Sequence, residues 1–195
     1  MTQDVLTIVK EYLSIFQEEK RQEKLLDFLK THRKEEYFDW NNFDGRIVAS
    51  GILYAKKEQE FLVLYHKDMK TYIYPGRHID LEDASILSAA KREVIEETGI
   101  KDFKLVKIAE EEEVPFDIDT HKIAYNTRLH LKEHYHFDFR YLFTIEEIQP
   151  VSYDKHELSN FHWASWEEIE ENRNFKRMLP KLKELLGKEN MEEKK

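Results

Sequence analysis

The chain has 195 residues, of which 41% are apolar and 36% charged, with a formal net charge of −9 and no cysteine. This length suits one domain with an appendage, and the apolar share is enough for a packed core. The negative charge repels polyanions and so disfavours a nucleic-acid partner. The lack of cysteine excludes disulfides and thiolate catalysis and favours the cytoplasm. No basic leader or long apolar run is present, so we expect neither secretion nor membrane spanning.

The first forty residues predict two helices. Apolar residues recur at helical spacing across residues 4–19, behind Asp4 as an expected cap, and again across residues 25–29. We interpret residues 1–42 as an N-terminal helical extension that covers the core. A dimer contact and a role in shaping the substrate cleft are the alternatives. The turn-rich residues 41–45 mark the end of this extension.

From residue 46 the hydrophobic pattern changes to that of strands, followed by a helix that starts near Ser85 and ends at the expected cap Gly99. The strands are predicted at residues 47–55, 61–65, 72–74, 103–109, 132–143 and 161–163. A helix is predicted from Trp166 to Leu186 and should end at Gly187. We therefore expect a domain over residues 43–187 and a disordered tail over residues 188–195.

The helix after Ser85 carries a dense group of charges in residues 92–100, which read R-E-V-I-E-E-T-G-I. At about 100° per residue, Glu93, Glu96 and Glu97 fall within one arc of the helix. Glu93 and Glu97 repel each other at i,i+4, and the single guanidinium of Arg92 cannot neutralise three carboxylates. A solvated charged face is one interpretation. A bound divalent cation is the other.

The preceding turn, Tyr74-Pro75-Gly76-Arg77-His78, extends this pattern. Residues 75–100 resemble the signature of the Nudix hydrolase superfamily, in which a glycine, five residues, Glu and seven residues precede R-E-U-x-E-E-x-G-U, with U aliphatic. The second half matches at every defined position. The first half departs: Arg77 stands at the glycine position, Asp83 at the acidic position, and eight residues instead of seven separate Asp83 from Arg92.

The resemblance covers residues 43–170 and implies an α/β fold, a Nudix-type α/β/α sandwich with a mixed sheet, to which the helical extension is added. It implies Mg²⁺-dependent hydrolysis of a pyrophosphate linkage in a nucleoside diphosphate joined to another moiety, as in a nucleotide sugar, ADP-ribose or a dinucleotide. Such an ion, for which Mn²⁺ can substitute, prefers oxygen ligands, neutralises phosphate and activates water.

The resemblance also assigns roles to individual residues. Glu96 and Glu97 would be the principal metal ligands, Glu93 a ligand or near neighbour, and Arg92 the residue that orients the glutamates. The backbone carbonyl of Arg77 would help to hold the ion. Because the family turn normally contains glycine, the side chain of Arg77 constrains that turn.

A second group of polar residues lies in the strand that begins at His134. In a strand, His134, His136, Asp138 and Arg140 share one face. A bacterial subgroup of Nudix-like proteins carries D-I-D-x-H followed by H-x-H-x-D-x-R, as residues 117–121 and 134–140 do here. We predict that these four residues and His78 bind the phosphate or the base of the substrate. An auxiliary Zn²⁺ or Mn²⁺ site and a simply wet strand face are the alternatives.

The general base has two candidates, Glu157 and Glu93. In several family members a glutamate before a W-x-x-x-E-E segment serves as base or additional metal ligand, and Glu157 occupies such a position. A solvated loop acid is the alternative. We expect a small-molecule nucleotide as partner, and a homodimer. A catalytically impaired Nudix-fold module that binds nucleotides or regulates is the second functional hypothesis, and a relative acting on a non-nucleotide phosphate or as an isomerase is the third.

Overall fold

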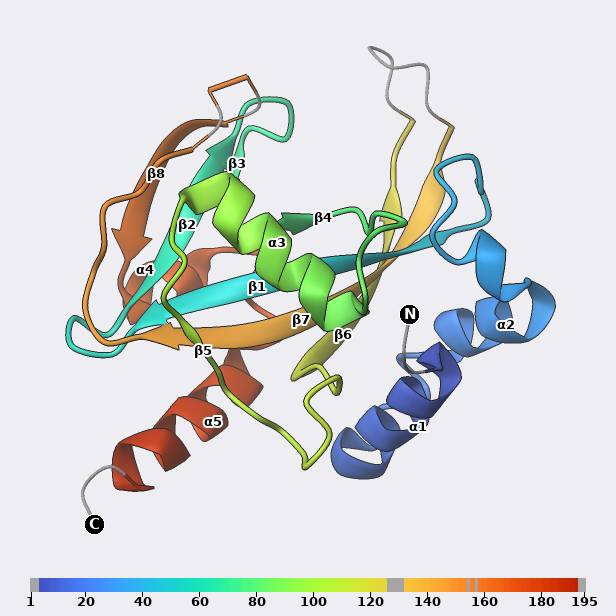
Figure 1. Cartoon of the computed structure of the whole chain (residues 1–195), viewed down its shortest axis with the longest axis horizontal. Helices are drawn as coiled ribbons and strands as arrows, with labels where there is room; N and C mark the ends of the chain where they lie inside the picture. Colours follow the sequence, from blue (N-terminus) through green and yellow to red (C-terminus); the bar gives the residue numbers. More distant parts are fainter. Residues whose placement is uncertain (1–3, 126–131, 154, 157, 193–195) are drawn as a thin grey trace. The chain divides into compact units, whose positions relative to one another are not determined.

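The computed structural model describes residues 4–125, 132–153, 155–156 and 158–192, without the side chains of Arg77 and residues 188–192. Within these ranges the helices are α1 (Val5–Phe16), α2 (Glu23–Thr31), the 3₁₀ helix η1 (Lys34–Glu36), α3 (Ile86–Thr98), α4 (Trp166–Glu171) and α5 (Leu179–Glu192) (Figure 1). The strands are β1 (Arg46–Ala55), β2 (Glu60–His66), β3 (Thr71–Ile73), β4 (Gly76–Arg77), β5 (Lys104–Leu105), β6 (Asp117–Ile123), β7 (His134–Ile145) and β8 (Leu158–Ala164). None of the helices described is long and apolar enough to cross a membrane.

The chain divides into two compact units. Unit 1 contains residues 1–50, 76–93 and 107–141, and unit 2 contains residues 51–75, 94–106 and 142–195. The elements β1, α3 and β7 each begin in unit 1 and end in unit 2 along the sequence. The strands belong to an eight-stranded sheet with the order β3-β2-β1-β7-β5, in which β4 pairs with β1, β6 with β7 and β8 with β2.

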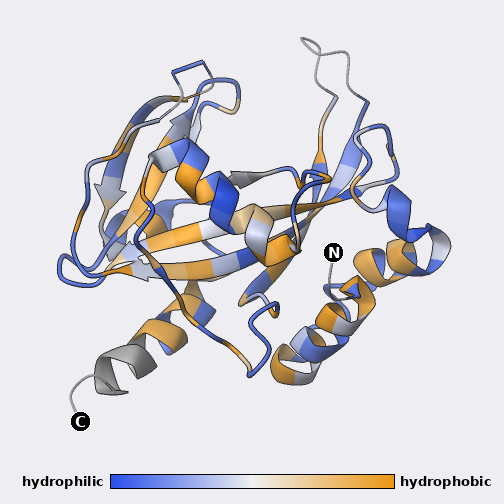
Figure 2. Ribbon diagram, in the orientation of Figure 1, coloured by the Kyte–Doolittle hydropathy of each residue, from blue (hydrophilic) through white to orange (hydrophobic). Residues whose placement is uncertain are grey.

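In unit 1, α1 contacts β6 and α2 contacts β7. Apolar residues recur along both helices (Figure 2), and those of α2 that are buried are Leu25, Phe28 and Leu29. The centre of the Phe28 ring lies 4.8 Å from that of Phe137. The backbone of Ile118, at the free edge of β6, is bonded by side chains. Its N–H donates to Tyr12 Oη at 3.3 Å, and its carbonyl accepts from Gln22 Nε2 at 2.7 Å. The extension therefore satisfies a strand edge that would otherwise be open.

In unit 2, β2 pairs antiparallel with β8 from Phe61 opposite Ala164 to His66 opposite Leu158. The ring of Phe61 contacts those of Trp166 and Phe175, at 4.8 and 6.2 Å. Phe61 and Phe175 are fully buried, so their contact belongs to the core of the unit.

The single helix predicted from Trp166 to Leu186 is wrong, because two helices flank an irregular segment from Asn172 to Met178. The amides of Asn172 and Asn174 both donate to the backbone carbonyl of Tyr72, at 3.1 and 2.8 Å. These tertiary hydrogen bonds compete with helix formation at the two asparagines. The second helix does not end at Gly187 either, since α5 continues to Glu192. Glycine weakens a helix without necessarily ending it.

Two further expectations need correction. The strand predicted over residues 103–109 is reduced to Lys104–Leu105, which pairs with Phe143 and Thr144 of β7. The strand β6 was not predicted, because its polar residues were interpreted only as an acidic and histidine cluster. The 3₁₀ helix η1 and the short strand β4 were not predicted either. The remaining helices and strands lie within a few residues of their predicted positions, and Gly99 follows α3 in the left-handed conformation at φ 73°.

Candidate functional site

Arg92 ties the loop before α3 to the helix itself. Its Nε and Nη2 donate to the two carboxylate oxygens of Asp83 at 3.1 and 2.9 Å, and its Nη1 donates to Glu93 at 2.9 Å. Nη2 also donates to the backbone carbonyl of His78 at 3.0 Å. A bidentate guanidinium–carboxylate pair fixes both distance and orientation. The acidic residue of the lengthened loop, Asp83, is thus anchored to α3, and Arg92 contacts at least one of the glutamates it was predicted to orient.

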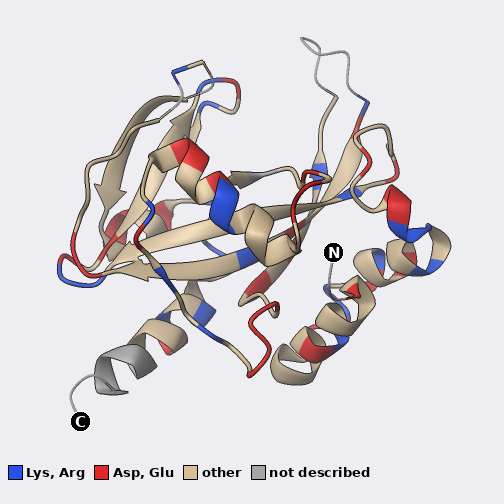
Figure 3. Ribbon diagram, viewed as in Figure 1, with Lys and Arg blue, Asp and Glu red and all other residues tan. Residues whose placement is uncertain are grey.

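The three glutamates lie on the continuous helix α3, where Figure 3 shows acidic and basic bands side by side. Glu93 is 7% exposed, Glu97 is half-buried and Glu96 is exposed. The helix begins with reciprocal hydrogen bonds between Ser85 and Ser88, which satisfy two backbone N–H groups of its first turn. Among the residues described, no group of three or more histidine, aspartate or glutamate side chains is already gathered for a metal ion.

The turn that precedes the loop requires glycine at one position. Gly76 has φ 141°, and a Cβ there would lie 2.4 Å from the Cα of Ser50. Arg77 follows in β4 and pairs with Ala49 of β1. The predicted role of the Arg77 carbonyl as a metal ligand stays a prediction. Glu157, the predicted base or metal ligand, lies outside the described residues.

His134 and His136 adjoin a buried arginine that the sequence did not single out. Arg46 Nη2 lies 2.6 Å from His134 Nε2, and the Nε2 atoms of His134 and His136 are 3.1 Å apart. Burial, followed by the charges of neighbouring groups, lowers the pKa of His136 to about 2. Burial and the charge of Arg46 also lower the pKa of His134. Both imidazoles are therefore neutral at pH 7.

His78 links this group to the loop before α3. Its ring stacks on that of Trp40 at 3.6 Å and meets that of His136 edge-on at 6.1 Å. The guanidinium of Arg46 lies 4.7 Å from the centre of the Trp40 ring. We call His78, His121, His134 and His136 the histidine cluster. The predicted site residues His78, His134 and His136 are thus brought together in unit 1.

Asp138 and Arg140, the other two predicted substrate-binding residues, are 3% exposed and bonded to protein groups. Asp138 accepts from Ser50 Oγ at 2.7 Å and from Arg140 Nε at 2.9 Å. Arg140 also donates to Asp117 at 2.9 Å and Asp119 at 3.0 Å. Direct substrate contact by these two residues stays a prediction. In this structure they form a buried ionic network.

The network also includes Arg21 from the extension, which sequence reasoning missed. Its guanidinium bonds to Asp117 at 3.1 Å and to Asp119 at 3.3 Å. Burial opposes the charged form of Asp119, but hydrogen bonding to His121 and the charges of Arg140 and Arg21 bring its pKa well below the ordinary value. The paired acids of D-I-D indicated that cations must lie nearby. Nothing in the sequence indicated that one comes from residue 21.

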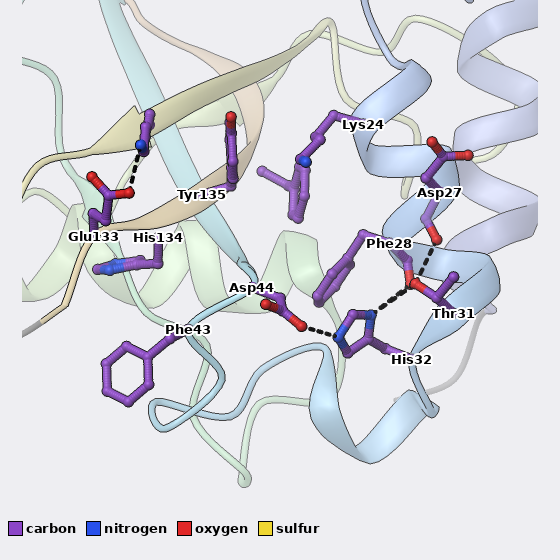
Figure 4. A pocket seen from close by; sticks show the side chains of 12 residues that line it. Lys24, Asp27, Phe28, Thr31, His32, Phe43, Asp44, Glu133, His134 and Tyr135 are labelled. Atoms are coloured by element: carbon purple, nitrogen blue, oxygen red, sulfur yellow. Dashed lines mark hydrogen bonds and ion pairs between the residues drawn. The ribbon is translucent and has the colours of Figure 1, made fainter.

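A pocket of about 310 Å³ opens in unit 1 between α2, the loop at residues 43–44 and strands β6 and β7 (Figure 4). Lys24 lies over the Tyr135 ring at 4.7 Å, and His32 contacts Asp44 at 3.1 Å. Of the predicted site residues whose side chains are described, only His134 lines it. The pocket mixes acidic, basic and aromatic groups in a way that favours no ligand class.

Comparison with known proteins places these features in a family context. The family model of the NUDIX domain matches residues 45–185. A protein of Lactococcus lactis subsp. cremoris (strain MG1363) named "Probable DHNTP pyrophosphohydrolase" is 30% identical over 147 residues, which are 75% of this chain and 81% of that protein.

Two solved structures resemble the chain in fold. The E. coli dihydroneopterin triphosphate pyrophosphohydrolase matches with a TM-score of 0.52 and 12% identity, over 72% of this chain and 94% of that one. A NUDIX-family hydrolase from Clostridium perfringens matches with a TM-score of 0.51 and 21% identity, over 72% and 95%. At such identities the likeness establishes the fold alone, and it confirms the predicted α/β class with a mixed sheet.

Proposed function

Because the chain belongs to the Nudix family and is a Nudix-type pyrophosphohydrolase, we propose that it hydrolyses its substrate with the help of Mg²⁺ bound to glutamates of α3. The observation that carries this proposal is the complete R-E-V-I-E-E-T-G-I segment, folded as the end of one continuous helix and closed by Gly99. A glutamate face without a cation would leave like charges crowded at i,i+4.

The donor set fits a hard divalent cation, and Nudix hydrolases generally use divalent metals. Carboxylate oxygens suit Mg²⁺, which keeps several waters and needs few protein ligands. Glu96 and Glu97 would hold the ion, with Glu93 and the Arg77 carbonyl as further candidates, and Mn²⁺ could replace Mg²⁺. When bound, the ion would neutralise phosphate oxygens and acidify a bound water.

The side chains of this protein would then position the reactants. Arg92 holds Glu93 and the loop at residues 78–83 in fixed relation, so the carboxylate does not need to be ordered during the reaction. The attacking water requires a base, for which Glu93 and Glu157 are the two candidates. A Gln substitution of the true base should lower kcat at every pH at which the wild-type enzyme is active.

For the substrate we propose dihydroneopterin triphosphate first, because the relative that is 30% identical carries that activity in its name. Water would attack a phosphorus of the triphosphate and break the bond between the α and β phosphates. The products would be dihydroneopterin monophosphate and pyrophosphate. A nucleoside diphosphate joined to another moiety, which the motif alone implies, is the second candidate.

The test is an assay of purified protein with Mg²⁺ on dihydroneopterin triphosphate, nucleotide sugars, ADP-ribose, dinucleoside polyphosphates and nucleoside triphosphates. We expect the highest kcat/KM with dihydroneopterin triphosphate and complete loss of product with EDTA. A higher kcat/KM for a nucleoside diphosphate derivative would favour the second candidate. EDTA-resistant turnover would contradict the metal proposal.

An impaired nucleotide-binding or regulatory module is the alternative function, and Arg77 with the lengthened loop is the observation that favours it. Tight binding of a panel compound without any turnover would support this alternative and contradict hydrolysis. A cytoplasmic location and a homodimer also remain predictions.

A further inference from the structure

Arg46 is the feature of unit 1 that the proposed reaction leaves unexplained. It is 1% exposed, and its guanidinium donates to the carbonyl of Trp40 at 3.0 Å and contacts His134 at 2.6 Å. In the described ranges no carboxylate forms an ion pair with it, and its Nε has no partner. Burying a charged guanidinium costs free energy unless its N–H groups find acceptors, so the two acceptors that it has are important for its position.

The contacts of His134 determine its tautomer. Its Nδ1 lies 2.7 Å from the backbone carbonyl of Lys132, which can only accept, so Nδ1 carries the hydrogen. The neutral ring then has a lone pair on Nε2, and Arg46, which can only donate, points Nη2 at that atom. The two contacts agree with each other and leave His134 Nε2 as an acceptor.

The tautomer of His136 follows from that of His134. Its Nε2 lies 3.1 Å from the Nε2 of His134, and two lone pairs facing each other at this distance would repel, so His136 carries its hydrogen on Nε2 and shares the one lone pair of His134 with Arg46. The remaining nitrogen, Nδ1, is then a lone-pair acceptor. In the part of the chain that is described, this atom has no protein partner and is not sealed from solvent. The lowered pKa of His136 agrees with a neutral ring.

The position of His136 relates this acceptor to the proposed reaction. Its ring adjoins that of His78, whose own carbonyl accepts a hydrogen bond from Arg92 at 3.0 Å. The acceptor is therefore connected to Arg92 of α3 through one loop residue, His78. A group held near it would belong to the part of the substrate that is not a phosphate, because a lone pair repels phosphate oxygens.

We propose that His136 is a specificity-determining residue, whose Nδ1 accepts a hydrogen bond from an N–H donor on the heterocycle of the substrate. Arg46 and His134 act as positioning residues that fix this acceptor. The ligand class is a heterocycle with a donor edge, such as the 2-aminopyrimidinone ring that pterin and guanine share. The proposal rests on the proposed function and deepens it, since it selects base contact over phosphate contact for this histidine.

Two variants separate the two nitrogens of the ring. His136→Gln keeps a donor in the place of Nε2 and loses the acceptor, whereas His136→Asn keeps an oxygen near the place of Nδ1. His162→Gln, on β8 with its ring beside Glu168 at 3.3 Å, is the matched control. Circular dichroism and thermal unfolding verify that each variant is folded before binding is measured.

The probes are dihydroneopterin monophosphate and guanosine monophosphate, which carry the ring, and pyrophosphate, which does not. Titration calorimetry of the full chain with Mg²⁺ should give an affinity for a ring-bearing probe that His136→Gln weakens about tenfold, the typical effect of one hydrogen bond. His136→Asn should weaken it less. Pyrophosphate affinity should be unchanged in all variants.

Equal weakening for the ring-bearing probes and pyrophosphate would overturn the proposal, as would wild-type protein that binds pyrophosphate but neither ring-bearing probe. Nitrogen-15 NMR of the histidines gives a test without ligand. We expect the Nε2–H tautomer for His136. The Nδ1–H tautomer would contradict the proposal, because Nδ1 would then be a donor. None of these measurements requires turnover. A failure of the proposed hydrolysis is therefore distinguishable from a failure of this inference.

Discussion

Arg92 shows how one side chain can organise a catalytic loop. It bonds to Asp83, Glu93 and the His78 carbonyl, and only a planar fork of donors can satisfy these directions together. The sequence places an arginine next to a glutamate. The consequence for the loop depends on the carbonyl and the acid that the fold brings to it.

We predict that Arg92→Lys lowers both stability and activity. A lysine offers a point charge and cannot keep the bidentate bond to Asp83 while also reaching Glu93. Loss of these charge-assisted bonds at a partly exposed site should cost about 1 to 2 kcal/mol of unfolding free energy. Urea denaturation and kcat with Mg²⁺ provide the measurements. An unchanged kcat would show that the hydrogen bonds of Arg92 do not position Glu93 for the reaction.

Glu97→Gln should abolish turnover and leave the fold intact. Substitution of outer-shell partners of a metal costs about 10- to 100-fold, so loss of a direct carboxylate ligand should cost at least about a hundredfold in kcat/KM. Glu110→Gln, at an exposed loop position, is the control and should keep wild-type activity. Normal Mg²⁺-dependent turnover by Glu97→Gln would remove this residue from the metal site.

The helical extension acts as a structural element of unit 1. Tyr12 and Gln22 bond the free edge of β6, and Arg21 enters the ionic network of Asp117 and Asp119. An unpaired strand edge favours association with other chains. The extension thus protects an edge and supplies a cation to two acids that Arg140 also binds.

Arg21→Met should therefore destabilise the protein more than its surface position suggests. Removing one partner from a buried ionic network costs about 3 to 5 kcal/mol, and partial solvent exposure of Arg21 reduces this to about 1 to 3 kcal/mol. The control is Arg33→Met, whose exposed pair with Glu36 should contribute less than about 1 kcal/mol. Equal losses in the two variants would show that the network does not depend on the extension.

The histidine cluster makes the stability of the whole molecule depend on pH. The pKa of His136 is about 2 in the folded chain, against the ordinary value of 6.5. Between these values the unfolded chain binds a proton that the folded chain does not, so stability rises with pH. The contribution of His136 is complete above about pH 6.5 and is lost as the pH falls toward 2.

We therefore predict that acid destabilises the protein from about pH 6.5 downward, by up to about 1.4 kcal/mol per pH unit for each such histidine. His136→Gln should flatten this dependence by one proton. Denaturant unfolding at pH 7, 6 and 5 measures the pH dependence of the unfolding free energy. Parallel curves for the wild type and His136→Gln would contradict the assigned pKa.

The sequence pattern was sufficient to predict those parts of the fold and of the candidate site whose residues are close together in the sequence. The helix with Glu93, Glu96 and Glu97, its cap at Gly99 and the shared face of His134, His136, Asp138 and Arg140 follow from the periods of helix and strand. The pattern failed at Asn172, where bonds to Tyr72 interrupt the last helix. Those bonds join residues a hundred positions apart, and propensity does not include them.

Periodicity also could not separate the four polar residues of β7 by role. It gave them one face, but Asp138 is paired with Arg140, which also binds Asp117 and Asp119. His136, in contrast, keeps an unpartnered acceptor among the described residues. The catalytic motif was determined by neighbours along the chain, because helix geometry is local. Only the tertiary structure decided which side chains are hydrogen-bonded within the protein and which keep an atom available to a ligand, because burial and hydrogen-bond partners come from distant segments.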